Sequence, residues 1–158
     1  MKTQDQKQEL LIKLLKENFD DLLKAKEALE FSMRKCNLLL PVKNKSLSND
    51  DLEIFEALTA RFARALDILT QKALTNIFVL MAENPVSFID KCQLAEKLGI
   101  IKNANDLIAM RRLRNEIAHE YRSIEVEQLF TSVCKNASVL CAMIEEIHAI
   151  VSQRNMLL

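Results

Sequence analysis

The chain has 158 residues, of which 49% are apolar, and its 22 Lys and Arg side chains balance 22 Asp and Glu. A chain of this length fits one domain, residues 1–158, which can bury a core without disulfides or metal. Because the charges cancel, the composition argues against a protein that coats nucleic acid nonspecifically.

The sequence predicts an all-α fold, since it contains one glycine and two prolines and is rich in Leu, Ala, Lys and Glu. Apolar residues recur at helical spacing over residues 5–36, which predicts one long first helix. Residues 40–47 interrupt the pattern. Ser48, with Asp51 three residues later, then fits the N-cap of a second long helix, which we expect to end at residues 84–85, Asn-Pro.

A short helix is predicted over residues 88–98, with Gly99 after it in the position where a left-handed cap needs glycine. A fourth helix is expected to begin within residues 103–106, and a fifth to follow Ser123. Four long amphipathic helices and one short one predict an antiparallel helical bundle.

The cysteines have no paired metal spacing, and we expect them to be buried apolar side chains in a reducing compartment. They are Cys36, Cys92, Cys134 and Cys141. The first residues lack the apolar block of a signal peptide, and no run approaches the roughly 20 apolar residues of a membrane span. We therefore expect a cytoplasmic protein with no membrane partner.

Residues 110–121 concentrate the polar chemistry of the chain: the only tyrosine, one of two histidines and three arginines. Arginine stays charged at any cellular pH, imidazole exchanges a proton near neutrality, and a tyrosine hydroxyl can be modified. This combination favours a site that handles phosphate. The simpler interpretation is that the arginines solvate a helix face, with Glu116 and Glu120 as ion-pair partners.

On the fourth helix, a helical wheel places a core-facing apolar stripe at Leu107, Met110, Leu113 and Ile117. Arg114 and Tyr121 fall within roughly 40° of this stripe, whereas His119 points about 180° away, on the face of Ile108, Arg111 and Asn115. Arg114 and His119 are about 140° apart on an ideal helix. Either the helix loosens near Ala118, or the site combines two subunits across a symmetric interface, which we favour.

The pattern Arg114-x4-His119-x-Tyr121, with the polar Asn115 directly after the arginine, resembles the signature of HEPN domains. It is most similar to that of the HepT-like toxins of nucleotidyltransferase toxin–antitoxin pairs. Neighbouring segments that also resemble this family extend the similarity over residues 48–122.

The resemblance implies a HEPN-like bundle and a metal-independent endoribonuclease toxin of a type VII-like pair, working on RNA as a homodimer without a cofactor. It implies that His119 is the general base at the 2′-hydroxyl or the acid at the leaving 5′-oxygen. Arg114 would hold the scissile phosphate. Asn115 would orient that phosphate or form a hydrogen bond within the cleft. On Tyr121 the cognate nucleotidyltransferase antitoxin would attach AMP, which blocks RNA by charge and bulk.

Other interpretations remain open. The chain contains Glu-x-x-His at residues 116–119 and 145–148, a motif of di-iron carboxylate bundles. The helical wheel turns these side chains away from the core, which argues against such a site, and His148 fits a residue at the stripe's edge. The main alternative is a noncatalytic HEPN-like helical protein that binds a nucleotidyltransferase or its substrate. A plain structural bundle is the third interpretation.

Overall fold

The computed structural model describes residues 3–40, 47–119 and 126–157, with only the backbone described at residues 119 and 126. The described residues form helices and connecting turns and contain no strand, so the predicted all-α fold is confirmed. The elements are α1 (Gln4–Asn37), α2 (Asn49–Asp67), the π-helical segment η1 (Ile68–Ala73), α3 (Leu74–Leu80), α4 (Phe88–Lys97), α5 (Ala104–His119) and α6 (Val126–Gln153).

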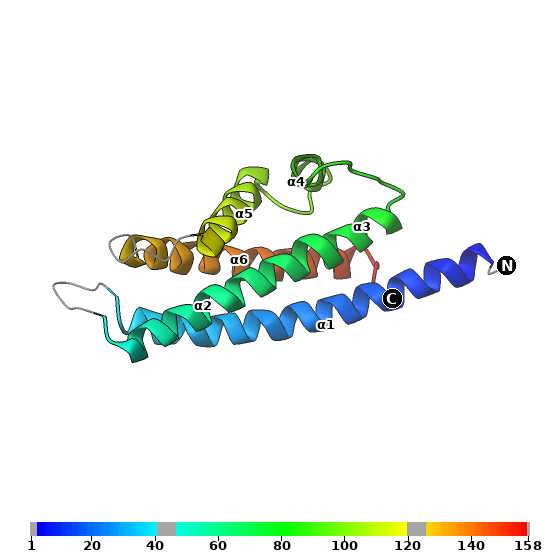
Figure 1. Ribbon diagram of the computed structural model, residues 1–158. Coiled ribbons are helices and arrows are strands. Elements are labelled where there is room, and N and C mark those ends of the chain that lie inside the picture. The colour runs from blue at the N-terminus through cyan, green and yellow to red at the C-terminus, as the bar shows by residue number, and fades with distance from the viewer. Residues whose placement is uncertain (1–2, 41–46, 120–125, 158) are drawn as a thin grey trace.

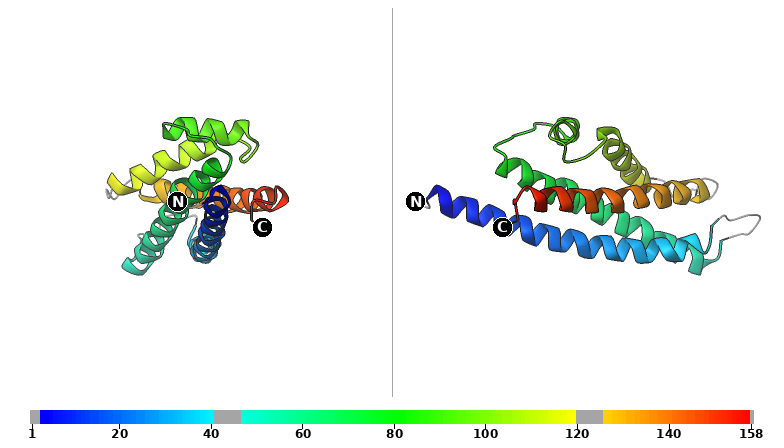
Figure 2. Two further views of the ribbon diagram at one scale, coloured as in Figure 1. Left: turned by 90° about the vertical axis from the view of Figure 1, so that its right-hand side faces the viewer. Right: turned by 180° about the vertical axis from the view of Figure 1, so that it is seen from behind.

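Three long helical rods form a bundle: α1, the continuous rod α2–η1–α3, and α6 (Figure 1). α1 runs antiparallel to the other two, which run in the same direction. α4 and α5 lie together on one side of this bundle, where α5 packs against α2 and α6 (Figure 2). No helix in the described ranges combines the length and the apolar character that crossing a membrane requires.

The core is built from fully buried leucines and phenylalanines that the three rods share. Phe55 of α2 stacks on Phe130 of α6 with ring centroids 3.9 Å apart and planes inclined by 10°. Phe19, Phe62 and Phe78 are also buried. Burying one such side chain contributes about 1.5–3 kcal/mol, so these contacts fix how the rods lie relative to one another.

The helix starts follow the capping residues of the sequence. The Asp51 carboxylate accepts a hydrogen bond from Ser48 N at 2.9 Å, and Asp51 N donates to Ser48 Oγ at 3.1 Å, which confirms the predicted capping box. Ser87 and Asp90 form a second capping box at the start of α4. After α4, Gly99 takes the expected left-handed conformation, with φ +65°.

The second long helix ends earlier than predicted, at Leu80 rather than at Asn84-Pro85. Ala82 adopts a left-handed φ of 58°. This conformation lets Glu83 N donate to Phe78 O over 2.8 Å and Ala82 N donate to Val79 O over 3.1 Å, which is the hydrogen-bond pattern of a Schellman motif. Alanine is not the residue expected in this conformation, so the sequence carried no signal for it.

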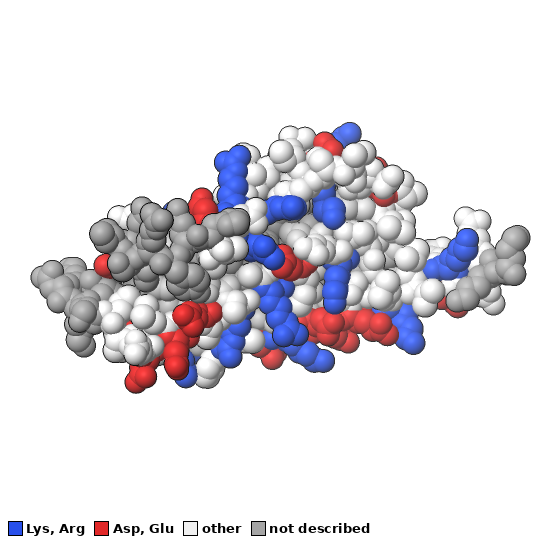
Figure 3. All heavy atoms as spheres, in the orientation of Figure 1, with Lys and Arg blue, Asp and Glu red and all other residues white. Residues whose placement is uncertain are grey.

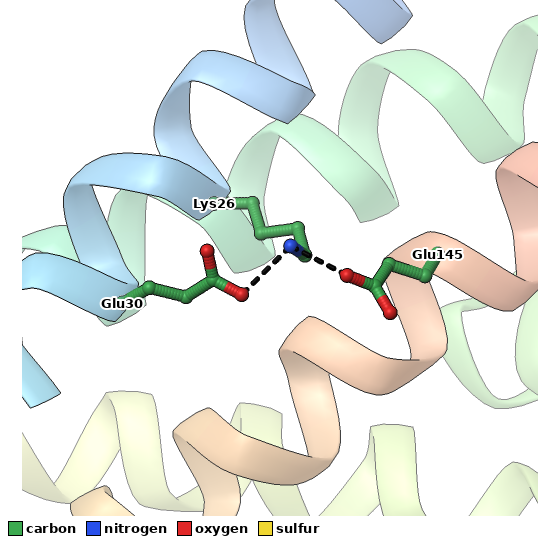
Figure 4. A network of polar contacts seen from close by, with 3 residues as sticks. All are labelled: Lys26, Glu30 and Glu145. Carbon is green, nitrogen blue, oxygen red and sulfur yellow. Dashed lines mark hydrogen bonds and ion pairs between the residues drawn. The ribbon is translucent and has the colours of Figure 1, made fainter.

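A lysine connects α1 to α6 within the bundle. Lys26 is 9% exposed, and its Nζ lies 2.7 Å from a carboxylate oxygen of Glu30 and 2.7 Å from one of Glu145 (Figure 4). Burial lowers the pKa of Lys26, but hydrogen bonds and the charges of Glu145 and Glu30 outweigh it, and the pKa is raised overall. The charged amine is therefore stabilised between the two helices.

Candidate functional site

α5, which carries Arg114, Asn115 and the backbone of His119, packs onto the rod α2–η1–α3. Leu107, Met110 and Leu113 are buried, and Ile117 is partly buried against the same core. This confirms the predicted apolar stripe. On the outer side Asn115 and Glu116 are exposed, and Arg114 is half-buried between the two sides.

A small pocket of about 100 Å³ lies where α5 crosses the junction of α2 and η1. Its lining residues are Leu66, Asp67, Thr70, Gln71, Arg111, Arg114 and Asn115. The pocket therefore brings together Arg114 and Asn115, two residues of the predicted site. The other wall comes from the end of α2 and from the π-helical segment, and π-helical turns inside α-helices recur at functional sites.

The π-helical segment is tied to its neighbours by side-chain hydrogen bonds. Thr70 Oγ1 donates to Leu66 O over 2.9 Å. Lys91 of α4 donates from Nζ to Thr70 O at 3.0 Å and to Thr75 Oγ1 at 2.9 Å. These bonds connect α4 to the pocket wall and hold the irregular turn in place.

Arg114 forms the principal charged contact of the pocket. Its Nη2 lies 3.0 Å from Asp67 Oδ2, and the two side chains are 38% and 36% exposed. A guanidinium has five N–H donors in a rigid fork, so one carboxylate contact leaves donors for a second anion. Arg111 and Arg114 contribute two positive charges and Asp67 one negative charge, which leaves the lining of the pocket with a net charge of one positive.

Arg111 separates this pocket from a second, more apolar groove. Its guanidinium carbon lies 4.1 Å from the centroid of the Phe88 ring, a cation–π contact. The groove has a volume of about 390 Å³ and is lined by Ser87, Phe88, Ile89, Ile108, Arg111, Arg112 and Asn115. Ile108, Arg111 and Asn115 thus share a face, as the helical wheel predicts. Burial lowers the pKa of the neighbouring Lys91, and the charge of Arg111 lowers it further.

The remaining two predicted site residues fall at the edge of the described chain. The backbone of His119 forms the end of α5, whereas its side chain and the whole of Tyr121 lie outside the described residues. Their convergence with Arg114 stays a prediction. Within the described ranges, Arg114 forms an ion pair with Asp67, and neither Arg111, Arg112 nor Arg114 pairs with Glu116.

Sequence reasoning missed the residues on the opposite wall of the pocket, namely Asp67, Thr70 and Gln71. Asp67 carried a weak signal, because it is an acid that follows Arg61 and Arg64 at intervals of three in the second half of an amphipathic helix. Thr70 and Gln71 carried none, because their position depends on the π-helical turn.

The residues of the Glu-x-x-His motif in α6 make structural contacts with α1. Glu145 is paired with Lys26, and the His148 ring lies 5.3 Å from the ring of Phe19. In the part of the chain that the structure describes, no three His, Cys, Asp or Glu side chains gather closely enough to hold a metal ion. His148 is half-buried, as predicted for the edge of the apolar stripe.

The cysteines are mostly buried, as predicted. Cys36, Cys92 and Cys141 are buried and Cys134 is partly exposed. Burial raises the pKa of the Cys92 thiol and of the Cys141 thiol, each to about 11, so both remain protonated near neutral pH.

The site that the geometry defines is a small pocket with two arginines, one aspartate and one asparagine, next to a larger apolar groove. No protein-family model matches the chain, and neither a curated protein nor a solved structure matches it at a significant level.

Proposed function

We propose that this protein is a HEPN-like, metal-independent endoribonuclease and the toxin of a type VII-like toxin–antitoxin pair. One observation carries the proposal. Arg114 and Asn115 line a pocket with a net positive charge on a helix whose last residue is His119. Guanidinium groups in such a pocket suit a phosphodiester, and an imidazole nearby supplies the proton transfer that metal-free cleavage of RNA needs.

In the proposed reaction, His119 accepts the proton of the 2′-hydroxyl, whose oxygen attacks the adjacent phosphorus. The bond from phosphorus to the 5′-oxygen breaks, that oxygen takes up a proton from water, and the products are a 2′,3′-cyclic phosphate and a 5′-hydroxyl. Arg114 stabilises the charge that gathers on the phosphate oxygens, and Asn115 orients the phosphate. Asp67 holds the Arg114 guanidinium in the pocket.

The active form in this proposal is a homodimer. Arg114 and His119 are about 140° apart on an ideal helix, so a single helix directs them to different places. Two copies related by a twofold axis would bring Arg114 of one chain to His119 of the other.

The direct test is cleavage of a labelled RNA by the purified full chain in the presence of EDTA. We expect cleavage to continue and the products to end in 2′,3′-cyclic phosphate, detected by mass spectrometry. His119→Ala should reduce the rate by about 10²–10⁴-fold with an unchanged circular dichroism spectrum, because general acid–base catalysis typically contributes that much. His148→Gln and Arg154→Gln are matched controls that should retain activity. Loss of activity with EDTA contradicts the proposal.

The shared site has its own test. Arg114→Ala and His119→Ala chains are mixed, partially denatured and then refolded together. In a mixed dimer, one of the two composite sites has both wild-type residues. Half of the dimers are mixed, so the mixture should recover about one quarter of the wild-type rate. If each chain held a complete site, the mixture would stay inactive.

Tyr121 is the proposed site of AMP attachment by a nucleotidyltransferase antitoxin. Co-expression with the product of a neighbouring nucleotidyltransferase gene, followed by peptide mass spectrometry, should find AMP on Tyr121 and loss of ribonuclease activity. Since the chain has one tyrosine, Tyr121→Phe is a complete control. A modified chain that cleaves RNA as well as the unmodified chain contradicts this role.

The Arg114–Asp67 ion pair also favours a second candidate function, because it occupies part of the guanidinium with a contact inside the chain. In that case the protein is a noncatalytic HEPN-like helical protein that binds a nucleotidyltransferase or its substrate. It predicts no RNA cleavage, and stable binding of the nucleotidyltransferase that Arg114→Ala does not weaken.

A further inference from the structure

A second concentration of positive charge surrounds an exposed aromatic ring of α1. We propose that Phe31, with Arg34, Lys35 and Arg61, forms a stacking platform for a base of single-stranded RNA. We refer to these four residues as the Phe31 platform. The proposal rests on the proposed function, in that RNA is the substrate, and it adds a binding site outside the cleavage pocket.

The contacts around Phe31 define the platform. The side chain is 46% exposed, so part of the ring remains open to solvent. Lys35 Nζ lies 4.9 Å from the ring centroid, and the guanidinium carbons of Arg61 and Arg34 lie 5.6 Å and 5.9 Å from it. Arg34 and Lys35 belong to the same helix as Phe31, whereas Arg61 reaches the ring from α2.

Arg61 is held in place by hydrogen bonds to α1. Its Nη1 donates to Ser32 Oγ at 2.6 Å and to Ala28 O at 3.3 Å. The guanidinium is therefore positioned beside the ring before any ligand arrives, which lowers the entropy lost on binding.

The cations of the platform form no ion pair with a described carboxylate. In the described ranges, no carboxylate oxygen lies within 4.0 Å of the nitrogens of Arg34, Lys35 or Arg61. Three like charges gathered around one ring repel each other, and the ring quadrupole offsets only part of this repulsion. An anion bound at the platform would relieve it.

Single-stranded RNA fits both properties of the platform. Its bases stack on exposed aromatic rings and on guanidinium planes, and its phosphates bind lysine and arginine. A simple anion would bind the positive charges but would make no contact with the ring. The base would stack on Phe31 in place of one of the cations that lie over the ring, and the displaced side chain would contact a flanking phosphate with the other two.

The platform is connected to the proposed cleavage pocket along α2. The exposed Arg64 lies three residues after Arg61, and Asp67 of the pocket lies three residues further. The rise from Arg61 to Asp67 is about 9 Å along the helix, and the two residues lie about 120° apart around it, so a strand of a few nucleotides would wind partly around α2. On this face, Lys and Arg side chains gather over the middle of α2 and the adjoining parts of α1 and α5 (Figure 3). Arg64 would be a further phosphate contact for a strand that runs between the pocket and Phe31.

The test is binding of a fluorescein-labelled 2′-O-methyl oligouridylate of about ten nucleotides, a length typical of single-strand sites. Its blocked 2′-oxygens prevent cleavage, so binding is measured by fluorescence anisotropy independently of activity. Phe31→Leu keeps the apolar bulk and removes the stacking face, and we expect binding about tenfold weaker. Phe31→Trp should bind at least as tightly as the parent. Val139→Ala, at an exposed apolar position of α6, is the control and should bind like the parent.

The charged part of the platform is tested by salt dependence. Lys35→Gln should reduce the slope of log affinity against log salt by roughly one half to one unit, as expected for the loss of one phosphate contact. An unchanged slope together with parental binding of Phe31→Leu overturns the proposal. So does a finding that Phe31→Leu changes the oligomeric state or nucleotidyltransferase binding while RNA binding stays parental, because the surface is then a protein interface.

The two proposals fail in different ways. If the oligonucleotide binds through Phe31 but RNA is not cleaved, the ribonuclease proposal fails and the platform stands. If RNA is cleaved with dependence on His119 while Phe31→Leu leaves binding and KM unchanged, the platform fails and the ribonuclease proposal stands.

Discussion

Arg114 on α5 donates a hydrogen bond from Nη2 to Asp67 Oδ2 on α2 over 3.0 Å, and this contact joins residues 47 positions apart. It fixes the direction of a guanidinium within a pocket that also contains Arg111 and Asn115. The same contact lowers the positive charge available to a ligand. Asp67 therefore affects both the position of Arg114 and the electrostatics of the pocket.

We predict that Asp67→Asn separates these two effects. The amide can still accept a hydrogen bond, but the loss of its charge raises the net charge of the pocket by one. RNA should bind more tightly and KM should fall, whereas kcat should also fall because Arg114 is held less firmly. Stability should change by less than about 1 kcal/mol, since both side chains are partly exposed. Thermal denaturation and steady-state kinetics measure the two effects. A large loss of stability would show that the ion pair is mainly structural.

Lys26→Met should destabilise the contact between α1 and α6. The substitution leaves Glu30 and Glu145 without the amine that separates their charges. Because both carboxylates are partly exposed, we expect a cost of about 1–3 kcal/mol, between the values for surface and buried pairs. Adding Glu145→Gln to Lys26→Met should recover part of the loss, and Lys24→Met, at an exposed position of the same helix, should be neutral in urea denaturation.

The pH dependence of this contribution follows from the raised pKa of Lys26, which hydrogen bonds and the charges of Glu145 and Glu30 cause despite burial. The stabilisation is complete below the ordinary pKa of a lysine and is lost only as pH rises through the folded value. The difference in stability between the parent and Lys26→Met should therefore stay constant around neutral pH. A difference that vanishes near neutrality contradicts the assignment.

Lys91→Met should loosen α4 from the π-helical segment, because it removes hydrogen bonds to Thr70 O and Thr75 Oγ1. We expect a loss of about 1 kcal/mol, the net value of a typical hydrogen bond, with part of the loss offset by relief of the burial of a charge. Lys97→Met, exposed on the same helix, is the matched control. Urea denaturation of both variants gives the difference, and equal stability of the two variants would contradict the prediction.

Lys91 also has a pH signature of the opposite sign to Lys26. Burial lowers its pKa, so in the pH range just below the ordinary lysine value the unfolded chain binds more protons than the folded one. Stability should rise with pH through this range in the parent, and Lys91→Met should reduce the rise. The comparison requires only the difference between the two proteins at each pH.

Cys134 should be the first cysteine to react with iodoacetamide at neutral pH. It is the partly exposed one of the four, and its interaction with the Cys36 thiol lowers its pKa, whereas the same interaction and burial raise the pKa of Cys36, whose Sγ donates to Ile54 O at 3.7 Å. The thiolate is the reactive form. Peptide mass spectrometry over time should find the adduct on Cys134, and Cys134→Ser should slow labelling of the whole protein. Equal rates at Cys92 and Cys134 would mean that the core opens before labelling.

Much of the helical architecture could be predicted because its signals are local. The spacing of apolar residues defined α1 and the buried side of α5, and Ser48 and Gly99 marked a helix start and a helix end. The error at the end of α3 has the same origin. Ala82 adopts a conformation for which its side chain gives no indication.

Only the α5 side of the candidate site could be predicted from the sequence. Arg114 and Asn115 belong to a compact pattern on one helix, so their type and spacing were visible in the sequence. Asp67, Thr70 and Gln71 line the same pocket from the middle of another rod, and no local rule connects the two segments.

Local patterns therefore specified most of the helical segments and the apolar side of each helix, because both depend on residues within a few turns of one another. The tertiary structure alone decided that Asp67 meets Arg114, that a π-helical turn forms one wall of the pocket, and that Arg61 reaches Phe31 from another helix. These contacts depend on how buried side chains of separate helices fit together, and that fit is a property of the packed core as a whole.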